Sequence, residues 1–174
     1  VACADFPVIL TALNSAVILT SSTDSRKVNL SEFFTGNRGT VRKKTELLAK
    51  ILIPLKNEKS AAAFEKFQRR AASSLAVVSV AVHLELENNI CKKSQIVLGA
   101  VSPIPLIAEK TCTFLSGREI SPAAVDKAAV IAQSEAKPIT DVRASADYRR
   151  ELVGVLLKRA LRKAVNRINK KNRI

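Results

Sequence analysis

The sequence contains few of the residues from which catalytic and metal sites are usually built. It has one histidine, five glycines and three cysteines, and no Trp or Met, in 174 residues. Cys3, Cys91 and Cys112 form no Cys-x-x-Cys pair, which excludes a zinc ribbon or an iron–sulfur binding run within this chain. Neither a Gly-x-Gly-x-x-Gly nor a Walker phosphate loop is present, and Gly-x-Ser-x-Gly is also absent. We therefore predict neither catalytic residues nor metal ligands here.

The lone histidine and the cysteines are more simply interpreted as structural residues. His83 lies in an alternating apolar stretch without an acidic or thiol neighbour in sequence, which favours a surface or structural role. The cysteines are interpreted as small buried hydrophobic residues. Widely spaced cysteines in odd number do not form a disulfide framework, which favours a reducing, cytoplasmic location.

Acidic residues are scarce, at 15 against 29 Lys and Arg, which gives a net charge of +14. Residues 158–174 carry eight basic side chains and no acidic one. An apolar stripe at helical spacing runs into the same region, which predicts a docked terminal helix with a solvated basic face: Leu152, Leu156, Ala160, Ala164 and Ile168. A basic face suits an acidic partner. Aromatic residues make up only 4% of the chain, which argues against a nucleic-acid binder that stacks bases.

The apolar segments are too short to cross a bilayer, and residues 75–82 are an example. Overall, 47% apolar and 25% charged residues are typical of a globular domain. The chain begins at Val1 without a basic leader or an apolar signal region, and it lacks an initiator Met. We interpret it as a mature or truncated product.

The first third of the chain predicts a small mixed unit. Asp5 stands at the N-cap position of a helix over 4–13, with Pro7 in its first turn. Strands are expected over 16–20 and 26–30, followed by a helical turn over 31–36. A buried strand over 46–54 is expected to end at Pro54.

The rest of the chain predicts a second unit in which strands precede helices. Residues 80–86 alternate apolar and polar, and Asn88-Asn89 is typical of a hairpin turn that leads into a returning strand over 90–101. The further elements are a strand that begins at 64–67 and helices over 106–115, 121–133 and 145–169. The fold class is therefore α+β, with a small three-stranded antiparallel sheet covered by C-terminal helices. We divide the chain into residues 1–54, a linker over 55–62 and a domain over 63–174.

Several motifs, in order, resemble one known family. They run from Ala4-Asp-Phe-Pro7 and Val28-Asn-Leu-Ser-Glu-Phe-Phe-Thr-Gly36 through Phe64-Glu-Lys-Phe-Gln-Arg-Arg70 and Ile96-Val-Leu-Gly-Ala-Val-Ser-Pro103 to Asp141-Val-Arg-Ala-Ser-Ala-Asp-Tyr-Arg-Arg150. Together they resemble the C-terminal half of the FAD-binding subunit of molybdenum hydroxylases, the xanthine dehydrogenase and carbon monoxide dehydrogenase flavoprotein family. By this resemblance, residues 1–54 are the remnant of the second FAD-binding lobe, and residues 63–174 are the flavoprotein C-terminal domain.

The resemblance implies three cofactor-binding positions, each with a simpler structural alternative. Asp5 matches a carboxylate that hydrogen-bonds the ribityl chain of the flavin; the alternative is N-capping alone. Leu48 matches a position whose backbone approaches the isoalloxazine ring, although its composition suits a core residue equally. Lys66 lies where a cation faces the flavin edge and would stabilise reduced, anionic flavin. It is equally interpreted as a solvated strand lysine, and a shift of one position would nominate Glu65 instead.

Weaker candidates and departures accompany these positions. Arg38 and Arg70 are secondary candidates for the approach to the flavin. Ser74 stands where the family commonly has Asp, and Ile107 stands where an Arg usually follows the Pro-x-Pro turn. By the resemblance, the family's glycine-rich phosphate loop and Gly-Gly-Asn loop would precede residue 1. The chain alone is then expected to bind FAD poorly.

The function that the resemblance implies is electron transfer within a heteromeric oxidoreductase. The subunit would pass electrons from [2Fe–2S] clusters through FAD to NAD+, oxygen or a quinone. Molybdopterin and [2Fe–2S] would reside on partner subunits, so the expected partners are the molybdenum-cofactor subunit, the [2Fe–2S] subunit and the N-terminal half of the FAD subunit. The chain by itself would be inactive. The alternative is a non-catalytic assembly module that no longer binds FAD.

Overall fold

The computed structural model describes residues 2–55, 58–70 and 75–171. The first lobe contains a three-stranded antiparallel sheet in the order β2-β1-β3 and two helices. Its elements are α1 (Asp5–Ala12), β1 (Ala16–Thr20), β2 (Ser25–Asn29), α2 (Leu30–Phe33) and β3 (Leu47–Leu52). Its core forms where α1 and α2 cover β1 and β2, around Leu10, Val17, Leu19, Val28 and Phe33. The predicted return of the second strand on the first is confirmed, with Val17 opposite Val28.

The second lobe contains a four-stranded antiparallel sheet in the order β4-β5-β6-β7. Its strands are β4 (Ser60–Gln68), β5 (Ala76–Glu87), β6 (Ile90–Gly99) and β7 (Leu106–Ile107), and its helices are α3 (Glu109–Leu115), α4 (Pro122–Glu135) and α5 (Ala146–Lys171). The predicted hairpin turn is confirmed, because Asn88 and Asn89 both adopt positive φ, at 50° and 64°. Ser121 caps α4 as expected and accepts a hydrogen bond from the backbone N–H of Ala124 at 3.3 Å.

The prediction of three strands was wrong by one short strand. Residues 106–115 were expected to be wholly helical, but Leu106 and Ile107 pair with Leu98 and Val97 before α3 begins at Glu109. The two prolines at 103 and 105 explain the difference. Each proline disfavours helical backbone in the residue before it, so the chain runs extended long enough to return along β6.

Strand β4 begins at Ser60, within the stretch predicted as a linker, and Lys56 and Asn57 of that stretch lie outside the described residues. Ala61 and Ala63 of β4 belong to the core that faces the C-terminal helices. Their small side chains let α5 lie close to the sheet. The strand was not predicted to begin here because a run of alanines is not a typical strand pattern.

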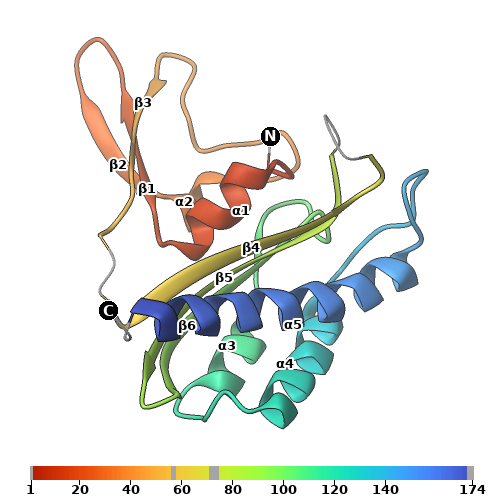
Figure 1. Ribbon diagram of the computed structural model, residues 1–174. Coiled ribbons are helices and arrows are strands. Elements are labelled where there is room, and N and C mark those ends of the chain that lie inside the picture. Colours follow the sequence, from red (N-terminus) through yellow and green to blue (C-terminus); the bar gives the residue numbers. More distant parts are fainter. Residues whose placement is uncertain (1, 56–57, 71–74, 172–174) are drawn as a thin grey trace.

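Helices cover both faces of this sheet (Figure 1). The long helix α5 crosses one face, with α3 and α4 beside it, and its predicted apolar stripe from Leu152 to Ile168 is buried there. On the other face, Val8 and Ala12 of α1 contact Ala81 and Val97. Strand β5 is therefore buried on both faces for nearly its whole length, and the first lobe lies directly on the second.

His83 lies within this double-sided sheet and is only 4% exposed. Alternation along β5 places it on the same face as Ala81, the face that α1 covers. Of the two predicted alternatives, a surface or a structural residue, the surface position is wrong, because the sheet has no solvent face at this point. In the described part of the chain, no helix is long and apolar enough to cross a membrane.

A buried carboxylate joins the loop before β3 to the β1–β2 hairpin. Glu46 is 6% exposed; it accepts hydrogen bonds from Arg26 Nε at 2.7 Å and from the backbone N–H of Lys43 at 2.7 Å. The Arg26 guanidinium, together with this backbone bond, lowers the pKa of Glu46 to about 2. Because the folded pKa lies below the unfolded value of about 4.3, the carboxylate stabilises the fold above pH ~4.

We expect this stabilisation to be lost as the pH falls from about 4 to about 2, through the folded pKa of Glu46. Thermal unfolding followed by circular dichroism at pH 6, 4 and 3 measures the effect. Glu46→Gln is the control, because it removes the titrating group and should flatten this part of the pH profile. A profile as steep in Glu46→Gln as in the native chain would show that other groups cause the loss.

Candidate functional site

Two of the predicted flavin residues, 61 positions apart in sequence, meet in the structure. Lys66 Nζ donates a hydrogen bond to Asp5 Oδ2 at 2.8 Å, which joins β4 of the second lobe to the first turn of α1. The side chains are 20% and 44% exposed, respectively, so the pair lies at the surface junction of the lobes. The Asp5–Lys66 pair therefore presents both a carboxylate and an ammonium group to the same place.

Asp5 is not the N-cap that the sequence predicted. The capping position of α1 is Ala4, Asp5 is the first helical residue, and no side chain caps this helix end. The Asp5 carboxylate instead reaches the ammonium group of Lys66. Asp5, two positions before Pro7, resembles a helix N-cap in the local sequence. In the fold, however, the ammonium group of Lys66 from the second lobe binds the same carboxylate.

Strand alternation places Lys66 and Glu65 on opposite faces of the sheet. Successive side chains of a strand point to opposite faces of the sheet. Lys66 turns toward α1, whereas Glu65 turns toward α5 and forms an ion pair with Lys163. Of these two residues, Lys66 is therefore the one on the face that α1 covers.

The close contact of α1 with the sheet depends on a glycine in β6. A Cβ atom built on Gly99 would lie 2.5 Å from a methyl carbon of Val8 and 2.3 Å from Ser79 Oγ, both well inside van der Waals contact. Val8 is completely buried, so it has no room to give way. Gly99 thus sets the distance between α1 and the sheet, and with it the position of Asp5 relative to Lys66.

Leu48 lies on β3, opposite Leu19 of β1, and is 42% exposed. Its interpretation as a core residue, and that of β3 as a buried strand, are both wrong. Every residue of β3 is exposed, because β3 is the edge of the first sheet and pairs with β1 alone in the described part of the chain. An apolar run indicates a strand, but it does not reveal whether another element covers it.

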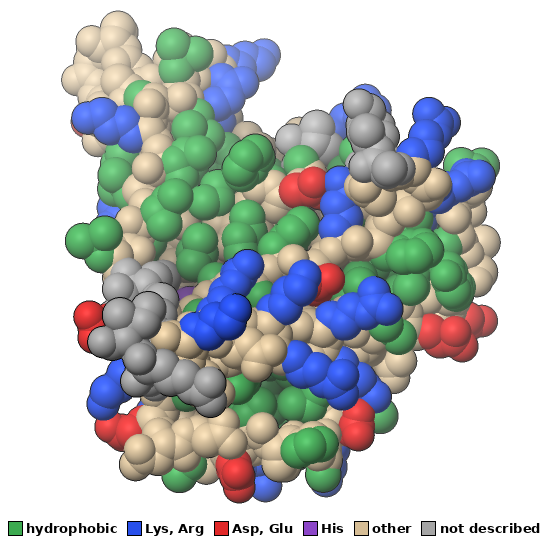
Figure 2. All heavy atoms as spheres, viewed as in Figure 1, with side chains coloured by type: hydrophobic (Ala, Val, Ile, Leu, Met, Phe, Trp, Pro, Cys, Tyr) green, Lys and Arg blue, Asp and Glu red, His purple; other side chains and the backbone are tan. Residues whose placement is uncertain are grey.

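The exposed edge forms an apolar surface, which we call the β3 surface. It consists of large side chains that are 40–74% exposed: Leu47, Leu48, Ile51, Leu52 and Ile53. Phe6, at the start of α1, is 75% exposed. Figure 2 shows apolar side chains gathered on this face of the first lobe, whereas Lys and Arg follow α5 below it. Exposed apolar edge strands of this kind mark interaction sites.

Arg38 and Arg70, the weaker candidates, are both exposed, and neither joins the Asp5–Lys66 pair among the described residues. Ser74 lies outside the described residues. Ile107 belongs to β7 and contacts the cluster under α1. These positions therefore add no further polar group to the junction.

The motif that begins at Asp141 forms an ion network rather than a surface site. Arg149 is 1% exposed; its Nη2 donates to Asp141 Oδ1 at 2.5 Å, and its Nη1 donates to the backbone carbonyls of Val77 and Ala100. Arg143 Nη2 donates to Asp141 Oδ2 at 2.6 Å. The hydrogen bond from Arg143, followed by the contact with Arg149, holds the pKa of Asp141 well below its usual range. The network fixes the start of α5 to the end of the sheet.

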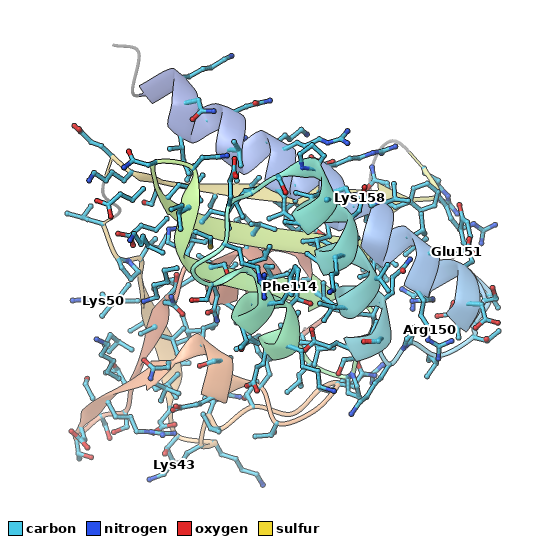
Figure 3. All side chains as sticks on the ribbon, turned by 90° about the horizontal axis from the view of Figure 1, so that it is seen from below. Lys43, Lys50, Phe114, Arg150, Glu151 and Lys158 are labelled. Atoms are coloured by element: carbon cyan, nitrogen blue, oxygen red, sulfur yellow. The ribbon has the colours of Figure 1, made fainter. Side chains whose placement is uncertain are left out.

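The exposed side of α5 also forms ion pairs at the protein surface. Figure 3 shows Lys158 beside α4, where its Nζ lies 2.6 Å from Asp126 Oδ1, and Arg150 farther toward the start of the helix. Both pairs at these residues are substantially exposed. They contribute little to stability in comparison with the buried network.

The Asp5–Lys66 pair and the β3 surface each offer part of what a flavin requires. A carboxylate accepts hydrogen bonds from sugar-type hydroxyls, an ammonium group stabilises developing negative charge, and an apolar surface suits an aromatic ring. The described residues include no group of His, Cys, Asp or Glu that could hold a metal ion. They also include no glycine-rich loop for a diphosphate. The described residues therefore supply groups that suit a flavin ring and a ribityl chain, but none that suits its diphosphate.

Family models match nearly the whole chain. Residues 2–56 match the FAD binding domain in molybdopterin dehydrogenase, and residues 62–164 match the CO dehydrogenase flavoprotein C-terminal domain. Among curated proteins, the chain is 32% identical over 92% of its length to the carbon monoxide dehydrogenase medium chain of Afipia carboxidovorans, covering 55% of that protein. It is 34% identical over 91% of its length to the glyceraldehyde dehydrogenase medium chain of Sulfolobus acidocaldarius, covering 56%.

Solved structures agree with these matches. The fold superposes with a TM-score of 0.89 on a chain of carbon monoxide dehydrogenase from Hydrogenophaga pseudoflava, at 29% identity, covering 94% of this chain and 56% of that one. The chain thus spans about half the length of the curated relatives it matches. With the C-terminal domain model matched across more than half of its residues, this chain belongs to the flavoprotein family of the molybdenum hydroxylases, which includes the medium chain of CO dehydrogenase.

Proposed function

We propose that this chain forms one wall of the flavin site in the FAD-binding subunit of a molybdenum hydroxylase-type oxidoreductase. FAD, when bound, would relay electrons from [2Fe–2S] clusters on a partner subunit to NAD+, oxygen or a quinone. The observation that carries the proposal is the Asp5–Lys66 pair, in which residues from the two matched family regions meet. Substrate oxidation would take place on the molybdenum-cofactor subunit.

The two charged residues would act as positioning and tuning groups. Asp5 Oδ1 has no hydrogen-bond partner among the described residues, since Lys66 binds Oδ2, so it is available to a ribityl hydroxyl. Lys66 is mostly buried at 20% exposure, so its charge is less screened than that of a surface lysine. An ammonium group held there would favour the reduced, anionic form of the flavin. The two roles are compatible because Asp5 keeps Lys66 in place.

The β3 surface would complete the site together with the remaining part of a family subunit. Five neighbouring apolar side chains, on an edge strand whose outer side pairs with no described residue, are a feature that folded proteins usually cover. The curated relatives are nearly twice as long as the matched region. We propose that the N-terminal half of the FAD-binding subunit covers this surface, supplies the phosphate loops and brings the flavin ring toward Leu48.

The first test of this proposal concerns FAD binding. Titration of the 174-residue chain with FAD, followed by flavin fluorescence, should show weak or no binding. Addition of the preceding part of a family FAD-binding lobe should produce a stable complex with flavin absorbance near roughly 450 nm. A complex that forms through the β3 surface but remains colourless would contradict the flavin role.

The second prediction concerns the potential of the bound flavin. In the reconstituted subunit, Lys66→Gln should lower the two-electron midpoint potential by about 20–30 mV, the equivalent of ~1–1.4 kcal/mol of lost charge stabilisation. Spectroelectrochemical titration measures the shift. Glu65→Gln is the matched control: it lies one residue away on the opposite face, paired with Lys163, and should leave the potential unchanged. Equal shifts in both variants would exclude a specific role for Lys66.

The alternative function is a non-catalytic assembly module. It is favoured by the charge of the exposed face of α5, where basic residues dominate. Such a module would bind an acidic protein partner with an affinity that falls with salt. The FAD titration separates the two functions, because a module would stay colourless even with the complementary half present.

A further inference from the structure

Helices α4 and α5 lie side by side on the same face of the second sheet, in contact along their length (Figure 1). At one end of this contact, a Cβ atom built on Gly154 would lie 2.7 Å from Gln133 Nε2. Farther along, Lys158 Nζ lies 2.6 Å from Asp126 Oδ1. The position thus rises along α5 as it falls along α4. The helices are therefore antiparallel, and the residues of α5 after Lys158 lie beside the start of α4.

An apolar groove lies between the two helices beside the start of α4, with a volume of about 260 Å³. Pockets that hold drug-sized ligands measure roughly 300–1,000 Å³, so this smaller groove suits a single large apolar side chain. Its lining is apolar apart from one guanidinium and one amide group: Ile120, Pro122, Val125, Val165, Arg162 and Asn166. No residue of this lining carries a carboxylate.

Two exposed valines continue this apolar character toward the other end of the helix pair. Val130 of α4 is 64% exposed, and Val155 of α5 is 44% exposed. Val130 follows Asp126 by one helical turn, and Val155 precedes Lys158 by nearly one turn. Because Asp126 and Lys158 contact each other, both valines lie beside the line where the helices meet. The groove and these two valines together form what we call the α4–α5 surface.

The surroundings of the α4–α5 surface are positively charged. Residues 152–170 of α5 include no acidic residue and the following basic ones: Lys158, Arg159, Arg162, Lys163, Arg167 and Lys170. Asp126 of α4 and Glu65 of β4 each form an ion pair with one of them. The remaining basic residues form no ion pair with any described residue. Figure 2 shows Lys and Arg side chains along α5. This excess of positive charge attracts carboxylates.

From this arrangement we infer that the α4–α5 surface binds an acidic amphipathic helix of a protein partner. Val155 and Val165 mark its two ends on α5, about 15 Å apart at 1.5 Å per residue. A partner helix of about three turns spans this length and can place one apolar side chain in the groove and another against the valines. Carboxylates beside its apolar stripe would meet Arg159 and Arg162. Recognition of an amphipathic helix in a groove combines the same two contributions.

The inference goes beyond the proposed function, because Asp5, Leu48 and Lys66 do not belong to the α4–α5 surface. The surface is the same whether or not the chain contributes to a flavin site, so failure of the FAD titration would leave the inference standing. It also differs from a purely electrostatic contact, since the binding would depend on apolar side chains as well as on charge.

The test uses the full 174-residue chain and a fluorescently labelled peptide of about 18 residues. The peptide carries Leu along one helical stripe, Glu beside this stripe and Ala elsewhere. Fluorescence anisotropy should show saturable binding with a Kd below about 1 mM. A second peptide, with Ser in place of every Leu, has the same charge and should bind at least about tenfold more weakly, because it buries no large apolar side chain.

Two variants locate the binding on the protein. Val155→Glu on α5 and Val130→Glu on α4 should each weaken binding of the Leu peptide about tenfold, because each removes an apolar contact and adds a like charge. Both valines are exposed, so the variants should keep the native fold, which circular dichroism checks. Val142→Glu is the matched control: it makes the same change at a 92% exposed valine outside the surface and should alter the Kd by less than about twofold.

Three results would overturn the inference. The first is the absence of saturable binding of the Leu peptide. The second is equal binding of the Leu and Ser peptides, which would reduce the contact to charge alone. The third is an equal effect of Val142→Glu and the two surface variants, which would place the binding elsewhere on the protein.

Discussion

Replacement of Arg149 with Gln is expected to lower the free energy of unfolding by about 3–5 kcal/mol. The guanidinium is 1% exposed and connects three structural elements: the Asp141 loop, the start of β5 through the Val77 carbonyl, and the end of β6 through the Ala100 carbonyl. Its removal leaves buried carbonyls without donors and reduces the charge opposite Asp141. Chemical denaturation followed by circular dichroism measures the loss.

Arg150→Gln is the matched control for this experiment. Arg150 is the next residue along α5, but its partner Asp147 is almost fully exposed, so the change should cost less than about 0.5 kcal/mol. If the two variants lose similar stability, the buried network does not anchor α5. In that event, the apolar stripe alone holds the helix on the sheet.

Gly99→Ala should also destabilise the fold, by about 1–3 kcal/mol, because a methyl group has no space between α1 and β6. The added carbon would overlap Val8 and Ser79 Oγ at 2.5 Å and 2.3 Å. The helix is expected to move away from the sheet and carry Asp5 with it. The change should therefore also weaken the Asp5–Lys66 contact, and reconstituted FAD binding should fall with it.

Gly36→Ala controls for the general effect of replacing a glycine. No atom lies within 4 Å of a Cβ built at Gly36, so this variant should keep native stability and native FAD binding. Denaturation curves and flavin fluorescence report both properties. Normal FAD binding by a destabilised Gly99→Ala subunit would show that FAD binding does not depend on the position of α1.

Local patterns in the sequence predicted much of the fold. Alternation and the Asn88-Asn89 turn predicted the β5–β6 hairpin, and the apolar stripe predicted the buried face of α5. The predictions that were wrong concerned properties that depend on residues distant in the sequence. The burial of His83 depends on α1, which lies some 70 positions earlier in the chain, and the exposure of β3 depends on the absence of a covering element among the described residues. Periodicity identifies an element, but not what lies above it.

The candidate site was predictable only in part. Asp5, Leu48 and Lys66 were named from family resemblance, and the structure brings Asp5 and Lys66 into contact while Leu48 lies on β3. Their roles toward a flavin remain proposals. The buried hydrogen bonds of Arg149 were not predicted, because the Val77 and Ala100 carbonyls come from distant segments and meet Arg149 only in the folded chain.

The sheet covered by α1 on one side and α5 on the other has a consequence for how the molecule opens. Amides of β5 bond to β4 and β6, and the strand is buried between α1 and α5 along most of its length. Their exchange with deuterium should proceed only through global unfolding, whereas amides of β3 exchange through local opening. The two lobes should accordingly melt in one transition rather than as independent domains.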